Sequence, residues 1–192
     1  NDTAKKLGLT SSHFANPDGL NDPNHLMSAR DLAMLAHHVI HDFPEYYHYF
    51  SEKEFQYHGI KQGNRNLLLY KNTGFDVDGL KTGHTDEAGY GFTGSAEQNG
   101  RRLIEVVAGM DSWNQRVQES TRLFQWGFGA WTDKPLFKAG AKVGSAQVQM
   151  GSSTEVPLVA PRDLAVTVPA GLSSGATSMK IRYDGPLMAP IA

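Results

Sequence analysis

Three consecutive residues, Lys81-Thr82-Gly83, carry groups that could bind a carboxylate. The lysine ammonium attracts the negative charge, and the threonine hydroxyl can donate a hydrogen bond to it. The glycine has no Cβ, so a bound peptide could lie close against the backbone there. A tripeptide is a short signal, and an exposed lysine before a turn is the alternative interpretation.

Two other patterns could carry chemistry, and their surroundings favour a structural role for both. Residues 89–94 (Gly-Tyr-Gly-Phe-Thr-Gly) fit the spacing of a dinucleotide-binding loop, but that loop must open a helix, and a hairpin signal follows here. His37 and His41 stand four apart on a predicted helix, a spacing that can ligate zinc. No glutamate follows His37, so a solvated or half-buried helix face is favoured. We therefore expect no cofactor and no metal.

Composition places the chain among ordinary globular proteins. Its 192 residues are 40% hydrophobic, and 18 basic against 20 acidic residues leave a formal net charge of -2, which argues against nucleic-acid binding. There is no cysteine, which excludes disulfides, thiolate metal sites and a cysteine nucleophile. No apolar run approaches the ~18 residues needed to span a bilayer.

The elements that must position Lys81 begin with a long loop and a helix. Residues 9–27 are rich in Asn, Asp, Pro and Gly and indicate the loop. Ser28 is the expected N-cap of the helix, with Asp31 three residues on as a variant of the capping box. Pro44 is expected to end the helix. Its buried face is predicted to contain Leu32, Leu35, Ala36, Val39 and Ile40.

Short strands are expected between residues 55 and 109, where the apolar residues no longer follow a helical period. The predicted strands are Asn66–Tyr70, Asp78–Gly83, Tyr90–Ala96 and Arg102–Ala108. Asn99-Gly100 lies between the last two and predicts a hairpin turn. Lys81-Thr82-Gly83 therefore lies on the strand before this hairpin.

A second helix is expected to follow the hairpin. Ser112 and Gln115 open it, and Gly127 is its expected end. The residues expected on one side of it are Trp113, Val117 and Phe124.

The last third of the chain predicts strands alone. The β-type runs are Val143–Met150, Leu164–Val168 and Met179–Tyr183. The predicted fold class is thus α+β, with an α/β domain over residues 1–132 and a small all-β domain over residues 133–192.

Both ends of the sequence predict that it is a segment of a longer chain. Lys5, Lys6 and Gly8 are typical of the end of a helix, whose beginning is then expected upstream. The last residues, 190–192, follow the β-type runs without a closing element.

Residues 77–90 closely resemble the D-alanyl-D-alanine carboxypeptidases, low-molecular-mass penicillin-binding proteins in which Lys-Thr-Gly is the third signature motif. Other segments resemble the same family in the same order, so that the resemblance covers essentially the whole chain. These segments are residues 7–14, 16–20, 28–33, 64–66, 101–109 and 126–128.

The resemblance implies a fold, a reaction and a set of site residues. The fold is a transpeptidase-like domain followed by a β-rich domain. The reaction is acyl transfer, in which a serine removes the terminal D-alanine of peptidoglycan stem peptides and is also acylated by β-lactams such as penicillin. Lys81, Thr82 and Gly83 would hold the substrate carboxylate, and the backbone N–H of His84 would donate to the oxyanion. The loop around residues 16–24 resembles one that lies near the family's site.

Arg65 and Arg116 match positions where the family places arginines beside the active site. A guanidinium fork suits a terminal carboxylate, so a substrate-binding role is expected for them. A surface ion pair is the alternative for each.

The sequence departs from the family pattern at the nucleophile. No Ser-x-x-Lys occurs in the 192 residues. Ser112-Trp113-Asn114 fits the family's Ser-x-Asn motif, but it follows Lys81 and opens a helix, so Ser112 is interpreted as an N-cap. The nucleophile is therefore expected in a missing N-terminal segment of the same protein, and the segment alone is expected to be inactive.

The family also implies a location and partners. We expect a bacterial periplasmic protein attached to the inner membrane through an anchor outside this chain. Its expected ligands are stem peptides ending in D-Ala-D-Ala, and β-lactams. Two alternatives remain: a β-lactamase-like hydrolase, which usually lacks a second domain, and a non-catalytic peptidoglycan-binding or scaffold module.

Overall fold

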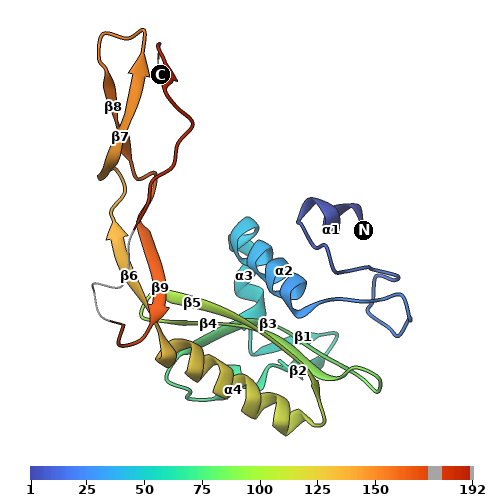
Figure 1. Ribbon diagram of the computed structural model, residues 1–192. Helices are drawn as coiled ribbons and strands as arrows, with labels where there is room; N and C mark the ends of the chain where they lie inside the picture. Colours follow the sequence, from blue (N-terminus) through green and yellow to red (C-terminus); the bar gives the residue numbers. More distant parts are fainter. Residues whose placement is uncertain (173–178, 191–192) are drawn as a thin grey trace. The chain divides into compact units, whose positions relative to one another are not determined.

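The computed structural model describes residues 1–172 and 179–190, and these form two compact units: unit 1 is Asn1–Phe128, and unit 2 contains the described residues from Gly129 onward (Figure 1). Unit 1 combines helices with antiparallel sheets. In unit 2, the regular elements described after Ala130 are strands. The fold class is α+β followed by a small all-β part, as the sequence predicts.

The centre of unit 1 is an antiparallel sheet of order β3-β4-β5. Its strands are β3 (Asp76–Thr85), β4 (Gly89–Gln98) and β5 (Arg101–Met110). Asn99 and Gly100 join β4 to β5 with φ of 54° and 74°, the double left-handed geometry of a type I′ turn. The predicted hairpin is confirmed. Among the described residues, β3 is paired only with β4, so its other edge is unpaired.

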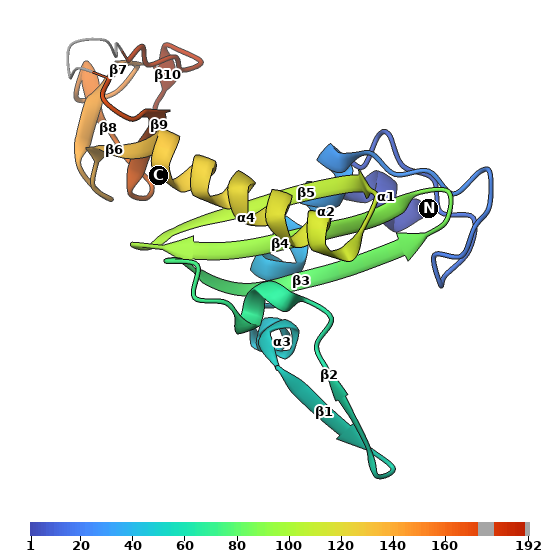
Figure 2. The ribbon, with the colours of Figure 1, turned by 90° about the horizontal axis from the view of Figure 1, so that it is seen from below.

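Two helices cover opposite faces of this sheet (Figures 1 and 2). One is α2 (Ala29–Asp42), and the other is α4 (Trp113–Ala130), which opens as predicted, with the Ser112 hydroxyl accepting from the N–H of Gln115 at 3.1 Å. A cluster of buried apolar side chains includes residues from β4 and α4. Its members are Leu68, Phe75, Phe92, Ala96, Val117 and Phe124.

Two predicted elements in unit 1 were wrong. Gly127 does not end α4, which continues to Ala130. Instead, Gly127 lies where the helix crosses β5, because a Cβ there would lie 2.7 Å from the Leu103 Cδ1 atom. The predicted strand Asn66–Tyr70 is a single 3₁₀ turn, η2 (Leu67–Tyr70), capped by the Asn66 side chain, which accepts from the N–H of Leu68.

The long loop before α2 is attached to that helix through Asp31. Ser28 is the N-cap, as predicted, and its hydroxyl accepts from the N–H of Asp31 at 3.1 Å. The Asp31 carboxylate is fully buried and accepts from the Ser12 hydroxyl and the Ser11 N–H, each at 2.8 Å. Burial alone would raise the pKa of Asp31, but these hydrogen bonds outweigh it and hold the pKa below its usual value. At the start of the chain, Gly8 follows α1 (Asp2–Lys6) with φ of 73°.

The part of the chain between α2 and β3 contains a hairpin, which extends away from the main sheet (Figure 2). It consists of β1 (Glu54–Tyr57) and β2 (Ile60–Gly63), paired antiparallel. The turns α3 (Pro44–Tyr47) and η1 (His48–Ser51) connect α2 to it.

Unit 2 contains two small sheets. One pairs β6 (Trp131–Phe137) with β9 (Leu164–Pro169), and the other has the order β10-β7-β8. The strands of the second sheet are β7 (Lys142–Gln149), β8 (Glu155–Val159) and β10 (Leu187–Met188). The predicted strand Met179–Tyr183 was wrong, since these residues form no ladder. Within this segment, the Tyr183 hydroxyl accepts a hydrogen bond from the N–H of Gln147 on β7.

None of the described helices combines the length and the apolar composition needed to cross a bilayer.

A buried carboxyl group lies in the core of unit 1 without a hydrogen-bond partner. Glu105 on β5 is 5% exposed, and neither of its carboxyl oxygens is hydrogen-bonded, nor is the buried hydroxyl of Ser120 on α4. Burial raises the pKa of Glu105 to about 8, and this effect far outweighs that of the nearby Ser120 hydroxyl, whose position allows no well-formed hydrogen bond to the carboxyl group. Glu105 is therefore protonated in the folded protein at neutral pH.

This burial predicts that stability falls with pH. Between the ordinary pKa of 4.5 and the folded value of about 8, Glu105 is ionised only in the unfolded chain, so rising pH favours unfolding until the folded group also ionises. Glu105→Gln cannot ionise and should lack this decline. Relative to its own value at pH 5, the variant should retain roughly 2–4 kcal/mol more unfolding free energy than the wild type at pH 8.

The measurement is urea denaturation of both proteins at half-unit intervals from pH 5 to 8. Glu52→Gln removes an exposed carboxylate and serves as the control, which should keep the wild-type slope. If Glu105→Gln keeps that slope as well, Glu105 is not the group responsible.

Candidate active site

Lys81, Thr82 and Gly83 lie on β3, the outer strand of the main sheet among the described residues, opposite Thr93, Phe92 and Gly91 of β4. The Lys81 side chain is exposed, and its Nζ atom donates to the carbonyl of Thr82. A Cβ added at Gly83 would meet no atom within 4 Å. In the described structure, the space beside Gly83 is therefore open to a second chain.

Arg116, in the first turn of α4, brings a second positive charge to β3. It is only 4% exposed, and its Nη1 atom donates to the carbonyl of Gly83 over a long 3.4 Å. The guanidinium carbon lies 4.8 Å from the centre of the Trp113 ring and 5.7 Å from that of Tyr90. Cation–π contacts with these two rings fix the guanidinium beside the strand.

Arg65, which follows the β1–β2 hairpin, supplies the third charge. Although the Lys81 side chain is exposed, the protein around it removes part of its water and so lowers its pKa, and the positive charges of Arg65 and Arg116 lower it further. The structure thus brings together the three cations that the sequence assigned to the site. Among the described residues, none of the three forms an ion pair with a carboxylate. This cluster, called here the cation cluster, suits an anionic ligand.

His84 continues β3 past Gly83. Its imidazole packs on the Tyr90 ring with 4.0 Å between ring centres, so the side chain is held on β4. Its backbone belongs to the strand that carries Lys81.

The predicted loop near the site lies beside the end of β3. Asn21 donates to the Glu87 carboxylate in the β3–β4 turn. A hollow of about 540 Å³ lies between the loop and this turn. Its lining includes Leu20, Asp22, His25 and Thr85.

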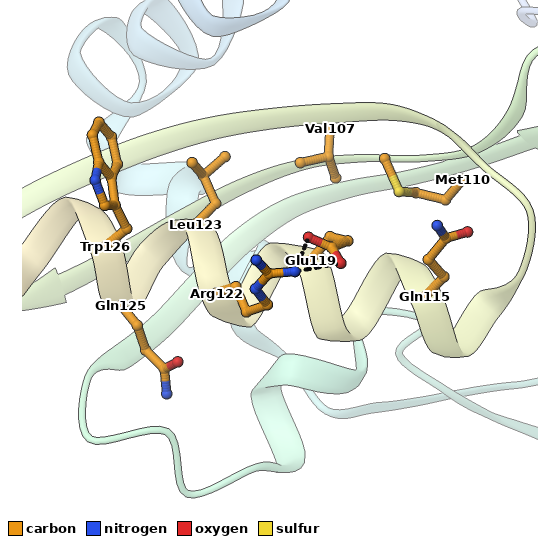
Figure 3. Close-up of a pocket in the computed structure, with 8 residues that line it drawn as sticks. All are labelled: Val107, Met110, Gln115, Glu119, Arg122, Leu123, Gln125 and Trp126. Carbon is orange, nitrogen blue, oxygen red and sulfur yellow. Dashed lines mark hydrogen bonds and ion pairs between the residues drawn. The ribbon is translucent and has the colours of Figure 1, made fainter.

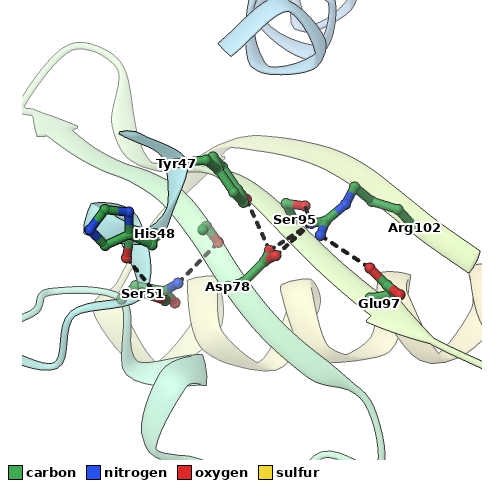
Figure 4. A network of polar contacts seen from close by, with 9 residues as sticks. Tyr47, His48, Ser51, Asp78, Ser95, Glu97 and Arg102 are labelled. Atoms are coloured by element: carbon green, nitrogen blue, oxygen red, sulfur yellow. Dashed lines mark hydrogen bonds and ion pairs between the residues drawn. The ribbon is translucent and has the colours of Figure 1, made fainter. Parts of the chain in front are cut away.

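Polar residues that the sequence did not single out fix the position of β3 (Figure 4). Asp78, three residues before Lys81, accepts from the Tyr47 hydroxyl at 2.9 Å and from Arg102 Nη1 at 2.6 and 2.8 Å. Arg102 also donates to Ser95 at 2.7 Å and to Glu97 at 3.1 Å. Burial raises the pKa of Tyr47, so its hydroxyl stays a donor. This network ties α3 and all three strands together near Lys81.

A larger hollow, of about 710 Å³, lies on α4 and β5 and contains none of the three cations (Figure 3). Its charged lining residues, Glu119 and Arg122, neutralise each other in an ion pair at 3.0 Å. We do not assign the site to it.

The patterns set aside from sequence take ordinary structural roles. Residues 89–94 lie along β4 and open no helix, so the geometry of a dinucleotide loop is missing. The His37 and His41 rings lie 4.2 Å apart on α2. In the described part of the chain, no group of three or more His, Asp or Glu side chains could hold a metal ion.

Comparisons with known proteins agree in pointing to one family. Residues 1–112 match the family model described as D-alanyl-D-alanine carboxypeptidase, and residues 131–192 match that of the penicillin-binding protein 5 C-terminal domain. The chain is 42% identical over 195 residues to D-alanyl-D-alanine carboxypeptidase DacA of Haemophilus influenzae, covering 100% of this chain and 49% of the relative. It is 41% identical to DacD of Escherichia coli, covering 88% and 43%.

Solved structures give the same result. Penicillin-binding protein 5 from Haemophilus influenzae superposes with a TM-score of 0.88 at 40% identity, covering 100% of this chain and 56% of that one. Penicillin-binding protein D2 from Listeria monocytogenes, in its ampicillin-bound form, superposes with a TM-score of 0.61 at 36% identity, covering 67% and 53%. The chain spans about half the length of the curated relatives it matches.

The cation cluster predicts a measurable coupling between its members. Arg65→Gln removes one positive charge, so the pKa of Lys81 should rise part of the way back to its ordinary value, with burial still holding it down. The pKa can be followed by NMR titration of the lysine Nζ resonances, with Lys81 assigned by substitution. Arg122→Gln, on α4 and paired with Glu119, is the matched control and should leave the value unchanged. An unchanged pKa in Arg65→Gln would separate Arg65 from the cluster.

Proposed function

We propose that this chain, which belongs to the D-alanyl-D-alanine carboxypeptidase family, provides the substrate-binding part of a serine-type D-Ala-D-Ala carboxypeptidase. The observation that carries the proposal is the cation cluster: Lys81 on β3, Arg116 in contact with the Gly83 carbonyl of β3, and Arg65, whose charge acts on Lys81, with no carboxylate paired to any of them among the described residues. Such a cluster is matched by the terminal carboxylate of a peptide.

The substrate lies along β3. The Lys81 ammonium and the Thr82 hydroxyl hold its terminal carboxylate, and Arg65 and Arg116 add positive potential. Gly83, whose missing Cβ leaves open space, lets the substrate backbone approach the strand. Penicillins carry a carboxylate of the same charge and bind in the same place.

The reaction is acyl transfer. A serine hydroxyl attacks the carbonyl between the two D-alanines, the peptide C–N bond breaks, and free D-alanine leaves with a proton on its amine. Water then hydrolyses the acyl–serine ester. The backbone N–H of His84 is one of two donors to the oxyanion, and removing such a donor costs about 2.7–4 kcal/mol in the transition state. We assign the serine to no residue of this chain.

The second part of the chain supports a carboxypeptidase over a β-lactamase. β-lactamases of this superfamily usually lack a second domain, whereas residues 131–192 match the C-terminal domain of penicillin-binding protein 5. We propose a domain boundary at residues 132 and 133, four residues after the division between the two compact units and near the start of β6. We also propose a bacterial periplasmic location with peripheral attachment to the inner membrane, and peptidoglycan stem peptides as substrate.

Lys81→Arg tests the role of the cation cluster. Arginine keeps the charge but changes the length and donor geometry of the side chain, so the carboxylate should be held in the wrong place. Acylation by a fluorescent penicillin and release of D-alanine from a soluble D-Ala-D-Ala peptide should both slow by at least about tenfold, equivalent to roughly 1.4 kcal/mol. The thermal midpoint should stay constant, because the Lys81 side chain is exposed.

The experiment uses the protein expressed from its complete reading frame. Lys71→Arg, at another exposed lysine, is the control and should change neither rate. Unchanged rates in Lys81→Arg would remove Lys81 from the site. No penicillin labelling of the wild type would favour the non-catalytic module, and rapid turnover of penicillin would favour a β-lactamase.

A further inference from the structure

The β1–β2 hairpin has one aromatic face and one charged face. Phe55 and Tyr57 alternate with Glu54 and Gln56 along β1, and in the antiparallel register they stand opposite Gln62 and Ile60. Side chains that face each other across such a pair lie on the same side of the sheet. One face therefore carries Phe55, Tyr57, Ile60 and Gln62. On the other face, Lys61 and Glu54 form an ion pair at 2.7 Å.

The aromatic face is open in the described structure. Phe55, Tyr57 and Ile60 are 67%, 64% and 62% exposed. The Phe55 and Tyr57 rings are nearly parallel, with 12° between their planes and 6.4 Å between their centres. These two nearly parallel rings, which stand on the same face of the hairpin, are called here the aromatic platform.

The base of the hairpin joins this platform to the cation cluster. The Asn64 side chain donates to the carbonyls of Glu52 and Phe50 at 2.9 and 3.2 Å, and its backbone N–H donates to that of Lys53 at 2.8 Å. These hydrogen bonds join the residue that follows β2 to the residues that precede β1, and so close the base of the hairpin. The next residue is Arg65, whose charge acts on Lys81. The platform is thus fixed close in sequence to the site where the peptide terminus is proposed to bind.

We propose that the aromatic platform binds the glycan strand to which the substrate peptide is attached, an inference that rests on the proposed function. Pyranose rings present flat faces of C–H groups, which pack on aromatic rings, and two nearly parallel rings can contact neighbouring sugars. The Gln62 amide on the same face can exchange hydrogen bonds with hydroxyl or acetamido groups. The cation cluster would then bind the carboxylate end of the peptide, and the aromatic platform would bind the glycan strand that carries the peptide.

Charge and size favour a glycan over other occupants. An anionic membrane surface attracts basic residues, whereas Lys61 lies on the opposite face and is paired with Glu54. A stable protein partner buries about 800 Å² on each side, far more than a few side chains provide. A sugar strand needs only a narrow row of contacts.

The test compares a double variant, Phe55→Ala with Tyr57→Ala, with a control pair on the opposite face, Glu54→Gln with Lys61→Gln. Both are made in the protein from the complete reading frame. Three quantities are measured: sedimentation with peptidoglycan stripped of its peptides, release of D-alanine from intact peptidoglycan, and release from a soluble D-Ala-D-Ala peptide. Losing two ring contacts should reduce the first two by about tenfold and change the third by less than about twofold. The control pair should resemble the wild type.

Phe55→Tyr with Tyr57→Phe keeps both rings and should retain binding to stripped glycan. Unchanged sedimentation of the alanine variant would overturn the proposal. The proposal would also be overturned if the alanine variant released D-alanine from the soluble peptide as slowly as from intact peptidoglycan and had a lower thermal midpoint, because the face would then pack against the protein itself. A third contrary result would be that the alanine variant loses binding to anionic vesicles while its binding to glycan is unchanged. Because binding to stripped glycan requires no catalysis, it decides the proposal even if the wild type releases no D-alanine and the proposed function fails.

Discussion

The positive charges of Lys81, Arg65 and Arg116 must be held together at β3, and this is the constraint that the proposed site places on unit 1. The three cations are close enough for the two arginines to lower the pKa of Lys81, and among the described residues no carboxylate pairs with any of them. Such a group is unfavourable until an anion arrives. The chain must therefore hold each charge in place by contacts that do not neutralise it.

Three different kinds of contact do so. Arg116 is held by the faces of two aromatic rings and by the start of a capped helix. Arg65 follows the residue that closes the base of the β1–β2 hairpin. Lys81 lies on a strand pinned three residues earlier, where Asp78 binds Tyr47 and Arg102. The carboxylates of Asp78 and Glu97 lie on the same sheet, but both pair with Arg102.

The sequence predicted those parts of the structure whose signal is local. Asn99-Gly100 identified a turn, and Ser28 and Ser112 identified helix starts, because each acts on backbone groups one to three residues away. The predictions were wrong where a contact with a residue distant in the sequence determines the local structure. Gly127 has the composition of a helix end, but its small size serves the approach to Leu103.

The residues of the candidate site also fall into those that could be predicted from the sequence and those that could not. Lys81-Thr82-Gly83 is contiguous and could be found as a motif, and family resemblance supplied Arg65 and Arg116. The Tyr47–Asp78–Arg102 network joins residues 24 and 31 positions apart, and no spacing rule connects them. The aromatic platform does alternate with polar residues along β1, but periodicity alone does not reveal that both faces of the hairpin are exposed.

An unpaired β edge is ordinarily a hazard, because it offers hydrogen-bonding groups to any extended segment. On β3, whose second edge is unpaired among the described residues, the cation cluster lies at Lys81 and Gly83. A neutral segment that paired there would remove water from the exposed charges of Lys81 and Arg65 without neutralising them, at a cost in free energy. A peptide that ends beside Lys81 brings a carboxylate and offsets that cost. Under the proposed function, the same charges therefore exclude the interior of a chain and select its terminus, and this is the difference between a carboxypeptidase and an endopeptidase.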